Sequence, residues 1–221
     1  MESLKLDKPA VIEVIGLPGS GKSFFAMQFA NTFGAAIVSN DKIRWTLFAN
    51  HTYSKDENQM VEQVADLTIS ELLKTKRTFI LDGGCNTRIE RENIEKLAKR
   101  AGFQVIMVVV QVDEQAAKRR ATKRNEKNPG DIYKQSIPVE EFEKTVKSLQ
   151  LPAVTKKTVV ISGKHTYSSQ ARAVLKKILE LQEVVKPAPA VATPIQISDE
   201  PKPVLTPRPA PILRGRGPFV Q

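Results

Sequence analysis

Residues 11–23 constrain the fold of this chain more than any other stretch. They read VIEVIGLPGSGKS, an apolar run followed by the pattern G-x-x-x-x-G-K-[ST]. The apolar run predicts a buried strand and residues 22–33 predict a helix, which is the context that a phosphate-binding loop requires. Glycines let successive main-chain N–H groups point at one anion, and the positive end of the helix dipole faces the same point. A glycine-rich turn with a chance lysine is the alternative, and the flanking strand and helix disfavour it.

Each residue type in this loop has a chemical use. We expect the Lys22 ammonium to reach the outer phosphates of a nucleoside triphosphate, and the Ser23 hydroxyl to bind Mg²⁺. The predicted nucleotide-binding segment also contains Gly16, Leu17, Pro18, Gly19, Ser20, Gly21 and Phe24.

The composition is compatible with one domain and an appendage. The chain has 221 residues, of which 41% are hydrophobic, and a formal net charge of +10. A basic surplus favours an anionic partner such as a nucleotide or nucleic acid, although lysine-rich solvated surfaces are common. Cys85 is the only cysteine, which excludes an internal disulfide and a cysteine-cluster metal site. Because no apolar run approaches ~20 residues and the N-terminus lacks an apolar leader, we expect a cytoplasmic protein with no membrane partner.

Predicted strands and helices alternate along residues 10–185. This order predicts an α/β fold whose sheet is parallel and covered by helices on both faces. The expected strands cover residues 10–15, 35–38, 78–81, 104–112 and 158–161. The expected helices cover residues 22–33, 41–49, 59–75, 88–101, 114–125, 139–149 and 168–185.

Helical periodicity predicts which residues of these helices face the core. The inward residues expected in the helix over 59–75 are Met60, Val64, Leu67 and Leu72. Those expected in the helix over 88–101 are Ile94, Leu97 and Ala98.

Two carboxylates stand where predicted strands end, at the sheet edge where open α/β sheets bind ligands. Asp41 precedes Arg44 by three residues on one side of a helix. The pair either acts on a substrate or is an N-cap with an incidental arginine. Asp82 follows four apolar residues and precedes two glycines. It is expected to hold Mg²⁺ through water or to accept a hydrogen bond from substrate, and an Asp-Gly turn is the alternative.

Basic residues gather in two places. Arg88 and Arg91 stand near a helix start, where the dipole does not favour cations, so they indicate either an anionic partner or solvated arginines. Between residues 115 and 134 there are seven Lys and Arg residues against two acidic ones. A solvated helix face is the ordinary explanation. After the fourth strand of a nucleotide-binding fold we instead expect a lid, with Arg120 and Arg124 on one helix face.

The composition changes at residue 186. The remaining residues are rich in proline, have little periodicity and bury too little apolar surface to offset the entropy of ordering. We therefore predict a P-loop domain over 1–185 and a basic, disordered tail over 186–221. The tail is either a plain terminus or a docking segment for a protein partner or nucleic acid.

Four stretches together resemble the small P-loop kinases grouped as zeta-toxin-like or AAA_33-type proteins: GLPGSGKS, SNDKIR, FILDGGCNTR and KRRATKR. The pattern is also similar to the kinase domain of phage polynucleotide kinase. The resemblance covers about residues 10–182. It implies a three-layer sandwich around a five-stranded, mostly parallel sheet of order 2-3-1-4-5, with ATP as the phosphoryl donor and Mg²⁺ as cofactor.

The resemblance also implies roles for single residues. Asp41 matches the general base that acts on the acceptor hydroxyl, and Arg44 matches the arginine that positions the acceptor. Arg124 matches the lid arginine that stabilises the transferring phosphoryl group, and Arg120 matches a lid position near the donor nucleotide. Asp82 matches the acidic end of the third strand.

The segment after Asp82 departs from the family pattern. Residues 83–88 stand in place of a shorter run of Asp-x-Thr-Asn character. We expect Asn86 to replace that asparagine and Arg88 to join the acceptor contacts. A phosphatase motif of the D-x-D-x-T type does not occur, so a two-domain end-healing enzyme is not expected.

Three functions fit these features. The first is transfer of the γ-phosphoryl group of ATP to a nucleic-acid 5′-hydroxyl, slightly favoured by the net charge of +10. The second is the same transfer to a nucleotide-sugar or another small metabolite. The third is an ATP-binding or slow ATPase module that acts through its tail.

Overall fold

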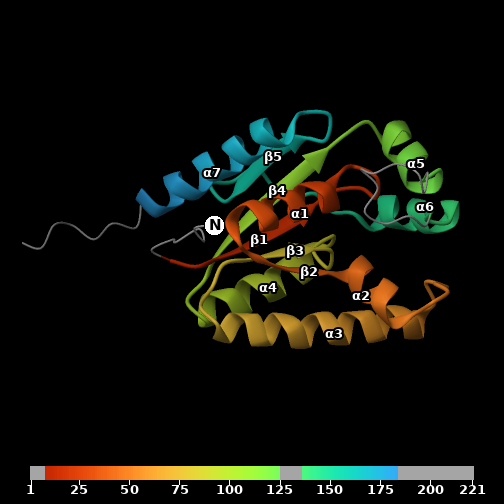
Figure 1. Ribbon diagram of the computed structural model, residues 1–221, viewed down its shortest axis with the longest axis horizontal. Coiled ribbons are helices and arrows are strands. Elements are labelled where there is room, and N and C mark those ends of the chain that lie inside the picture. The colour runs from red at the N-terminus through yellow and green to blue at the C-terminus, as the bar shows by residue number, and fades with distance from the viewer. Residues whose placement is uncertain (1–7, 125–135, 184–221) are drawn as a thin grey trace, which may run out of the picture. The chain divides into compact units, whose positions relative to one another are not determined.

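Five parallel strands form the sheet, and they lie in the order β2-β3-β1-β4-β5 (Figure 1). The strands are β1 (Ala10–Ile15), β2 (Ala36–Ser39), β3 (Phe79–Asp82), β4 (Gln104–Gln111) and β5 (Thr158–Ser162). The α/β class and this strand order confirm the prediction. The computed structural model describes residues 8–124 and 136–183. The predicted tail lies outside the described residues, so its disorder stays a prediction.

Helices cover both faces of the sheet. One face packs against α1 (Lys22–Phe33) and α7 (Tyr167–Glu183), and the other packs against α3 (Lys55–Lys74) and α4 (Arg88–Arg100). Three shorter helices lie toward the carboxyl ends of the strands: α2 (Asn40–Leu47), α5 (Glu114–Thr122) and α6 (Val139–Ser148). None of the described helices is long and apolar enough to cross a bilayer.

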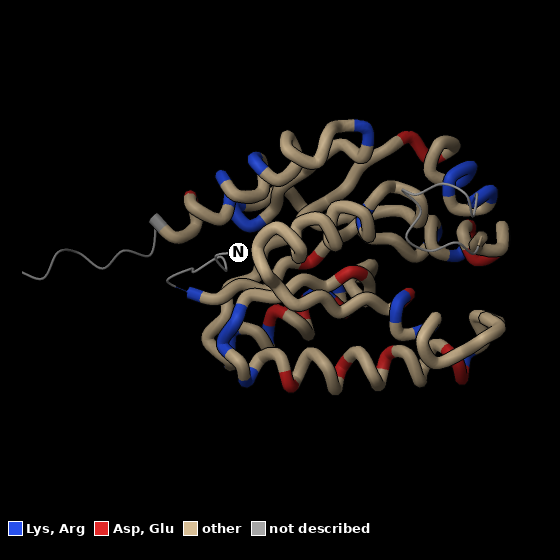
Figure 2. The backbone as a smooth tube through the Cα atoms, in the orientation of Figure 1, with Lys and Arg blue, Asp and Glu red and all other residues tan. Residues whose placement is uncertain are grey.

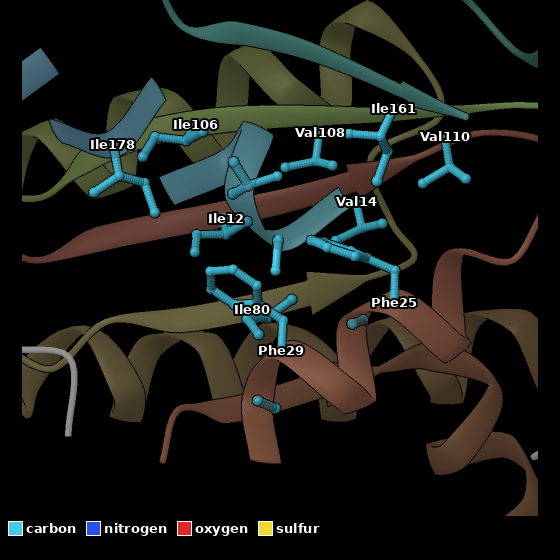
Figure 3. Packing of buried hydrophobic residues seen from close by; sticks show 14 of the residues in the cluster. Ile12, Val14, Phe25, Phe29, Ile80, Ile106, Val108, Val110, Ile161 and Ile178 are labelled. Carbon is cyan, nitrogen blue, oxygen red and sulfur yellow. The ribbon is translucent and has the colours of Figure 1, made fainter. Parts of the chain in front are cut away.

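The alternation of side chains along β1 explains the three layers. Ile12 and Val14 point to the α1 face, where Phe25 and Phe29 of α1 pack against them (Figure 3). Val11 and Ile15 point to the opposite face, toward α3 and α4. A central parallel strand is buried on both faces, and for that reason β1 is apolar at every position except Glu13.

The structure corrects the predicted inward face of α3. The buried apolar residues are Val61, Ala65, Ile69 and Leu73. The predicted residues Met60, Val64 and Leu67 are exposed. The helix begins earlier than predicted because the Ser54 hydroxyl caps it by accepting a hydrogen bond from the Glu57 amide. In α4, Ile94 and Ala98 are buried as predicted, but Leu97 is exposed.

One charged residue lies inside the sheet. Glu13 of β1 is fully buried, and neither of its carboxylate oxygens has a hydrogen-bond partner among the described residues. Burial raises the pKa of Glu13 to about 8, although the positive charges of Arg91 and Lys157 oppose the shift.

We expect Glu13 to make the folded protein less stable as the pH rises from 5 to 8, by about 3 kcal/mol. An unfolded glutamate ionises near pH 4.5, whereas the folded one stays protonated up to about pH 8. Above pH 4.5 unfolding therefore releases a proton, and it becomes more favourable as the pH rises. Urea unfolding at pH 5 and pH 8 should show this loss in the parent but not in Glu13→Gln. Glu62→Gln, at an exposed position of α3, should behave like the parent.

Candidate active site

The loop between β1 and α1 packs so closely that it requires glycine. Gly19 has a φ of 78°, and a Cβ atom added there would lie 2.3 Å from the carbonyl oxygen of Ala117 in α5. A Cβ atom added to Gly16 would lie 2.5 Å from the carbonyl oxygen of Val110 in β4. The glycines thus bring the loop against β4 and α5 as well as making it turn.

Lys22 lies close to both predicted carboxylates. Its Nζ donates a hydrogen bond to the Leu17 carbonyl oxygen at 2.9 Å. Burial lowers the pKa of Lys22, and the negative charges of Asp82 and Asp41 oppose that shift. The ammonium is therefore held by the loop itself, within electrostatic reach of these two acidic residues.

Asp82 lies at the end of β3 and is almost fully buried. The Ser39 hydroxyl donates a hydrogen bond to Asp82 Oδ2 at 3.0 Å, and the Ser23 hydroxyl lies close enough to help lower the pKa of the carboxyl. Burial raises the pKa of Asp82, while Lys22 and the two hydroxyl groups oppose the rise. The two residues predicted to hold Mg²⁺, Ser23 and Asp82, are thus in contact.

A cleft of about 800 Å³ opens above this loop. The predicted site residues that line it are Gly16, Pro18, Gly19, Gly21, Lys22, Ser23, Phe24, Asp41, Arg44, Asp82, Asn86, Arg120 and Arg124. Leu17 and Ser20 do not line it: Leu17 packs against α5 and α6, and Ser20 is buried. Residues 16–24 therefore approach a ligand in the cleft through the remaining side chains and the main chain.

Arg88 is not brought to the cleft, which corrects its expected place among the acceptor contacts. Its side chain is 79% exposed, and Nε donates to Glu92 at 2.6 Å within α4. Thr87 caps α4 with Glu90 in a reciprocal capping box, so α4 begins at Arg88 and its side chain runs along the outer surface. Arg91 is buried instead, and its Nη1 donates to the carbonyl oxygens of Cys85 and Asn86.

Cations of α5 and of the two residues after it line one part of the cleft. Figure 2 shows Lys and Arg gathered along α5, and the residues of this cluster that line the cleft are Arg119, Arg120, Lys123 and Arg124. The charge of Arg124 influences the pKa of both Lys22 and Tyr53, so it lies within electrostatic reach of the two. Residues 125–135, which complete the predicted lid, lie outside the described part of the chain.

The opposite side of the cleft contains a buried ion pair. Arg44 of α2 forms an ion pair with Glu57 of α3, and its guanidinium also donates a hydrogen bond to Asn58 Oδ1 at 2.7 Å. The ring of Tyr53 lies against the guanidinium, with 4.6 Å between Cζ and the ring centroid. Asp41 lies one turn before Arg44, but it does not cap α2, because the Ser39 hydroxyl accepts the capping hydrogen bond from the Lys42 amide.

Glu57 organises this side of the cleft. Burial raises its pKa, but hydrogen bonds from Arg44 and Thr52 outweigh burial and lower it to about 2. The amides of Thr52 and Tyr53 both donate to Glu57 Oε2, at 2.7 and 3.1 Å. The same carboxylate therefore holds Arg44 and the loop that carries Tyr53.

We expect Glu57→Gln to destabilise the fold by about 2–4 kcal/mol, because it leaves a buried guanidinium without its charged partner. If the cleft is a kinase site, the variant should also raise the KM for the acceptor and leave ATP affinity unchanged. Glu71→Gln is the matched control, since Glu71 is an exposed partner of Lys74 on the same helix and should cost below about 1 kcal/mol. Urea unfolding measures both variants, and equal stability of the two would contradict the buried role of Glu57.

Comparison with known families decides where the chain belongs. Residues 11–152, which contain the loop, Asp41, Asp82 and α5, match the model of the family AAA_33, described as an AAA domain. The chain is a member of the AAA_33 family.

Two curated relatives resemble parts of this AAA_33 protein. Human heterogeneous nuclear ribonucleoprotein U-like protein 2 is 33% identical over 147 residues, which are 61% of this chain and 19% of the relative. An adenylate kinase from Lactobacillus johnsonii is 28% identical over 123 residues, which are 50% of this chain and 57% of the enzyme. The chain thus spans about a fifth and just over half of the lengths of these relatives.

Solved structures with this fold include several kinases. A gluconokinase from Sinorhizobium meliloti 1021 has a TM-score of 0.58 and 18% identity, covering 80% of this chain and 95% of its own. The APS kinase of Mycobacterium tuberculosis, in complex with AMPPNP and APS, has a TM-score of 0.54 and 17% identity, covering 78% and 98%. A chain of the Pnkp1/Rnl/Hen1 RNA repair complex has a TM-score of 0.52 and 22% identity, covering 66% and 45%. The AAA_33 chain therefore has the fold of P-loop kinases.

The oxygen atoms available as metal ligands in the cleft fit Mg²⁺. No group of three or more His, Cys, Asp or Glu residues that could cage a metal occurs among the described residues. Mg²⁺ is commonly bound by one or two carboxylates together with substrate phosphates and water, so such a cage is not required. The contact between the Ser23 hydroxyl and the Asp82 carboxylate supplies two oxygen ligands beside the phosphate-binding loop.

Proposed function

We propose that the chain is a Mg²⁺-dependent phosphotransferase that moves the γ-phosphoryl group of ATP to a hydroxyl group. The observation that carries the proposal is one cleft in which the phosphate-binding loop, Asp41 and the cations of α5 meet. The kinases among the similar proteins support this reaction class.

On the donor side, Lys22 and the loop amides bind the outer phosphates of ATP. Mg²⁺ held by Ser23 and Asp82 would neutralise charge that develops on the phosphate oxygens. Arg124 places its guanidinium on the transferring phosphoryl group, and Arg120 contacts the donor nucleotide. Phosphoryl transfer depends mainly on positioning and charge stabilisation, which these groups provide.

On the acceptor side, Asp41 accepts the proton of the attacking hydroxyl as general base. Arg44 and Asn86 orient the acceptor. Arg44 is suited to this task because Glu57 and Asn58 restrict its rotation. A held side chain loses little further freedom when a substrate binds.

A nucleic-acid 5′-hydroxyl is the acceptor that we propose first. Tyr53 lines the cleft with the Arg44 guanidinium against its ring, an arrangement of aromatic and cationic groups on which bases stack. The net charge of +10 favours an anionic polymer. The similarity to a chain of an RNA repair complex agrees with this choice.

A small metabolite is the second candidate, and one observation favours it. The charge of Arg44 is balanced by Glu57, so Arg44 attracts an acceptor phosphate less strongly than a lone arginine does. An uncharged hydroxyl compound such as a sugar needs no such attraction. A gluconokinase is among the proteins with this fold.

Incubation of the protein with γ-labelled ATP and Mg²⁺ tests the proposal. One reaction contains a 5′-hydroxyl oligonucleotide and another contains a mixture of sugars and nucleotide-sugars. Label on the oligonucleotide supports the first acceptor, and label on a metabolite supports the second. Label found only in free phosphate, or the absence of ATP uptake in equilibrium dialysis, contradicts the transferase.

A further inference from the structure

A pair of aromatic rings lies one helical turn beyond Asp41. Trp45 belongs to α2, and His51 belongs to the loop that joins α2 to α3 at the carboxyl end of the sheet (Figure 1). Their ring centroids are 5.3 Å apart, and Trp45 is 39% exposed. Asp41 and Trp45 stand four residues apart, so they share one side of α2 and lie about 6 Å apart along its axis. The ring pair therefore continues the side of α2 that lines the cleft through Asp41.

The loop that carries His51 is held in place by hydrogen bonds. Glu57 Oε2 accepts one from the Thr52 amide at 2.7 Å and one from the Tyr53 amide at 3.1 Å. Tyr53 has a φ of 54°, a left-handed conformation that is strained for a bulky residue. Strain of this kind gathers at ligand-binding sites, where the surrounding structure maintains it. The loop thus directs Tyr53 into the cleft and His51 against Trp45.

A cation lies beside the ring pair. Lys42 precedes Trp45 by three residues, which makes the two neighbours on the surface of α2. It is exposed, and its ammonium forms no salt bridge within the part of the chain that the structure describes. Exposed aromatic rings next to a cation are the groups with which proteins bind single-stranded nucleic acid, because bases stack on the rings and the phosphates attract the cation.

We propose that the acceptor is a single strand of at least two nucleotides, and that the base of its second nucleotide stacks on Trp45 with His51 supporting the indole. This inference rests on the function proposed above, since it places the reacting 5′-hydroxyl at Asp41. The second nucleotide is one phosphodiester link from the first, so it reaches the next turn of α2, where Lys42 contacts the phosphate. The bases of a duplex are already paired and stacked, which favours a single strand.

The fluorescence of Trp45 tests the proposal, because Trp45 is the single tryptophan of the chain. The full chain is titrated with thymidine 3′-phosphate and with 5′-hydroxyl oligothymidylates of two and four nucleotides. We expect both oligonucleotides to quench the fluorescence in a saturable way. Thymidine 3′-phosphate should leave it nearly unchanged, since one nucleotide fills the cleft without reaching the indole.

Transfer from labelled ATP provides a second measurement, made on three variants. Trp45→Ala should raise the KM for the four-nucleotide strand at least tenfold, and leave the KM values for ATP and thymidine 3′-phosphate within a few-fold of the parent. Trp45→Phe keeps an aromatic ring and should restore the KM for the strand to within a few-fold. Leu47→Ala is the matched control, since Leu47 is also exposed on α2, and it should leave all three KM values unchanged.

The two measurements separate this inference from the proposed function. Absence of saturable quenching by both oligonucleotides, or equal KM values of the parent and Trp45→Ala for the strand, overturns the role of the ring pair. If label still reaches the oligonucleotide in that case, the transferase stands and only the ring pair is wrong. Saturable quenching without transfer of label supports the strand-binding surface and contradicts the transferase.

Discussion

Replacing Arg124 with alanine is expected to lower turnover by about 10³-fold or more and to leave ATP affinity within a few-fold of the parent. An arginine placed over a transferring phosphoryl group acts mainly on the charge that develops in the transition state, so its loss affects the rate more than binding. Turnover at saturating ATP, together with equilibrium dialysis of magnesium-ATP, separates the two effects.

Two further variants provide a comparison and a control for Arg124→Ala. Lys22→Ala should reduce both ATP binding and turnover, since Lys22 lies within the phosphate-binding loop. Arg172→Ala removes an exposed arginine on α7, outside the residues that line the cleft, and should leave both quantities unchanged. A turnover of Arg124→Ala within a few-fold of the parent means that the lid assignment is wrong.

Replacing Asp41 with asparagine is expected to lower phosphoryl transfer by about 10²–10⁴-fold while ATP binding persists. Asparagine has nearly the same shape as aspartate but cannot accept the proton of the attacking hydroxyl at neutral pH. Asp41 lines the cleft and lies near Lys22 and Asp82, so the change acts at the centre of the site. Single-turnover transfer from labelled ATP measures the chemical step directly.

Asp56→Asn is the matched control for this variant. Asp56 is an exposed aspartate in the first turn of α3, as Asp41 is in the first turn of α2. Both changes alter the charge at a helix start, but only Asp41 lines the cleft. If the two variants transfer phosphate equally well, Asp41 has no role as a base.

The place of the glycine-rich loop between a strand and a helix could be predicted because its residues are close in sequence. The loop over 16–23 joins one strand to one helix, and its glycines and lysine occupy consecutive positions. Asp41 and Asp82 were found by a topological rule, since parallel strands bring their carboxyl ends to one edge of the sheet. That rule places a residue at an edge without giving its contacts.

The contacts on the α2–α3 side of the cleft were predicted only in part. Arg44 was identified, but its ion pair with Glu57 and the contribution of Tyr53 and Asn58 were not. The periodicity of residues 45–60 carries no sign of these contacts. A charged residue on the inward stripe of α3, at Glu57, was the one available signal.

Arg88 and Arg91 show how a small difference in helix phase decides a role. Both stand in the first turns of α4, yet Arg88 follows the exposed surface and Arg91 turns inward to two carbonyl oxygens. Glu13 is a similar case, because a charged residue in an apolar run suggests an edge or a solvated face. In the folded chain it is fully buried between β3 and β4.

The amino-acid sequence alone determined the α/β alternation and the glycine-rich loop of this AAA_33 protein. These features depend on local propensity, on side-chain periodicity and on neighbours within a few residues. The tertiary structure decided the pairing of Arg44 with Glu57, the outward course of Arg88 and the complete burial of Glu13. Those features arise where elements distant in sequence pack together, so burial and the available partners, which no local pattern specifies, determine what each charged side chain contacts.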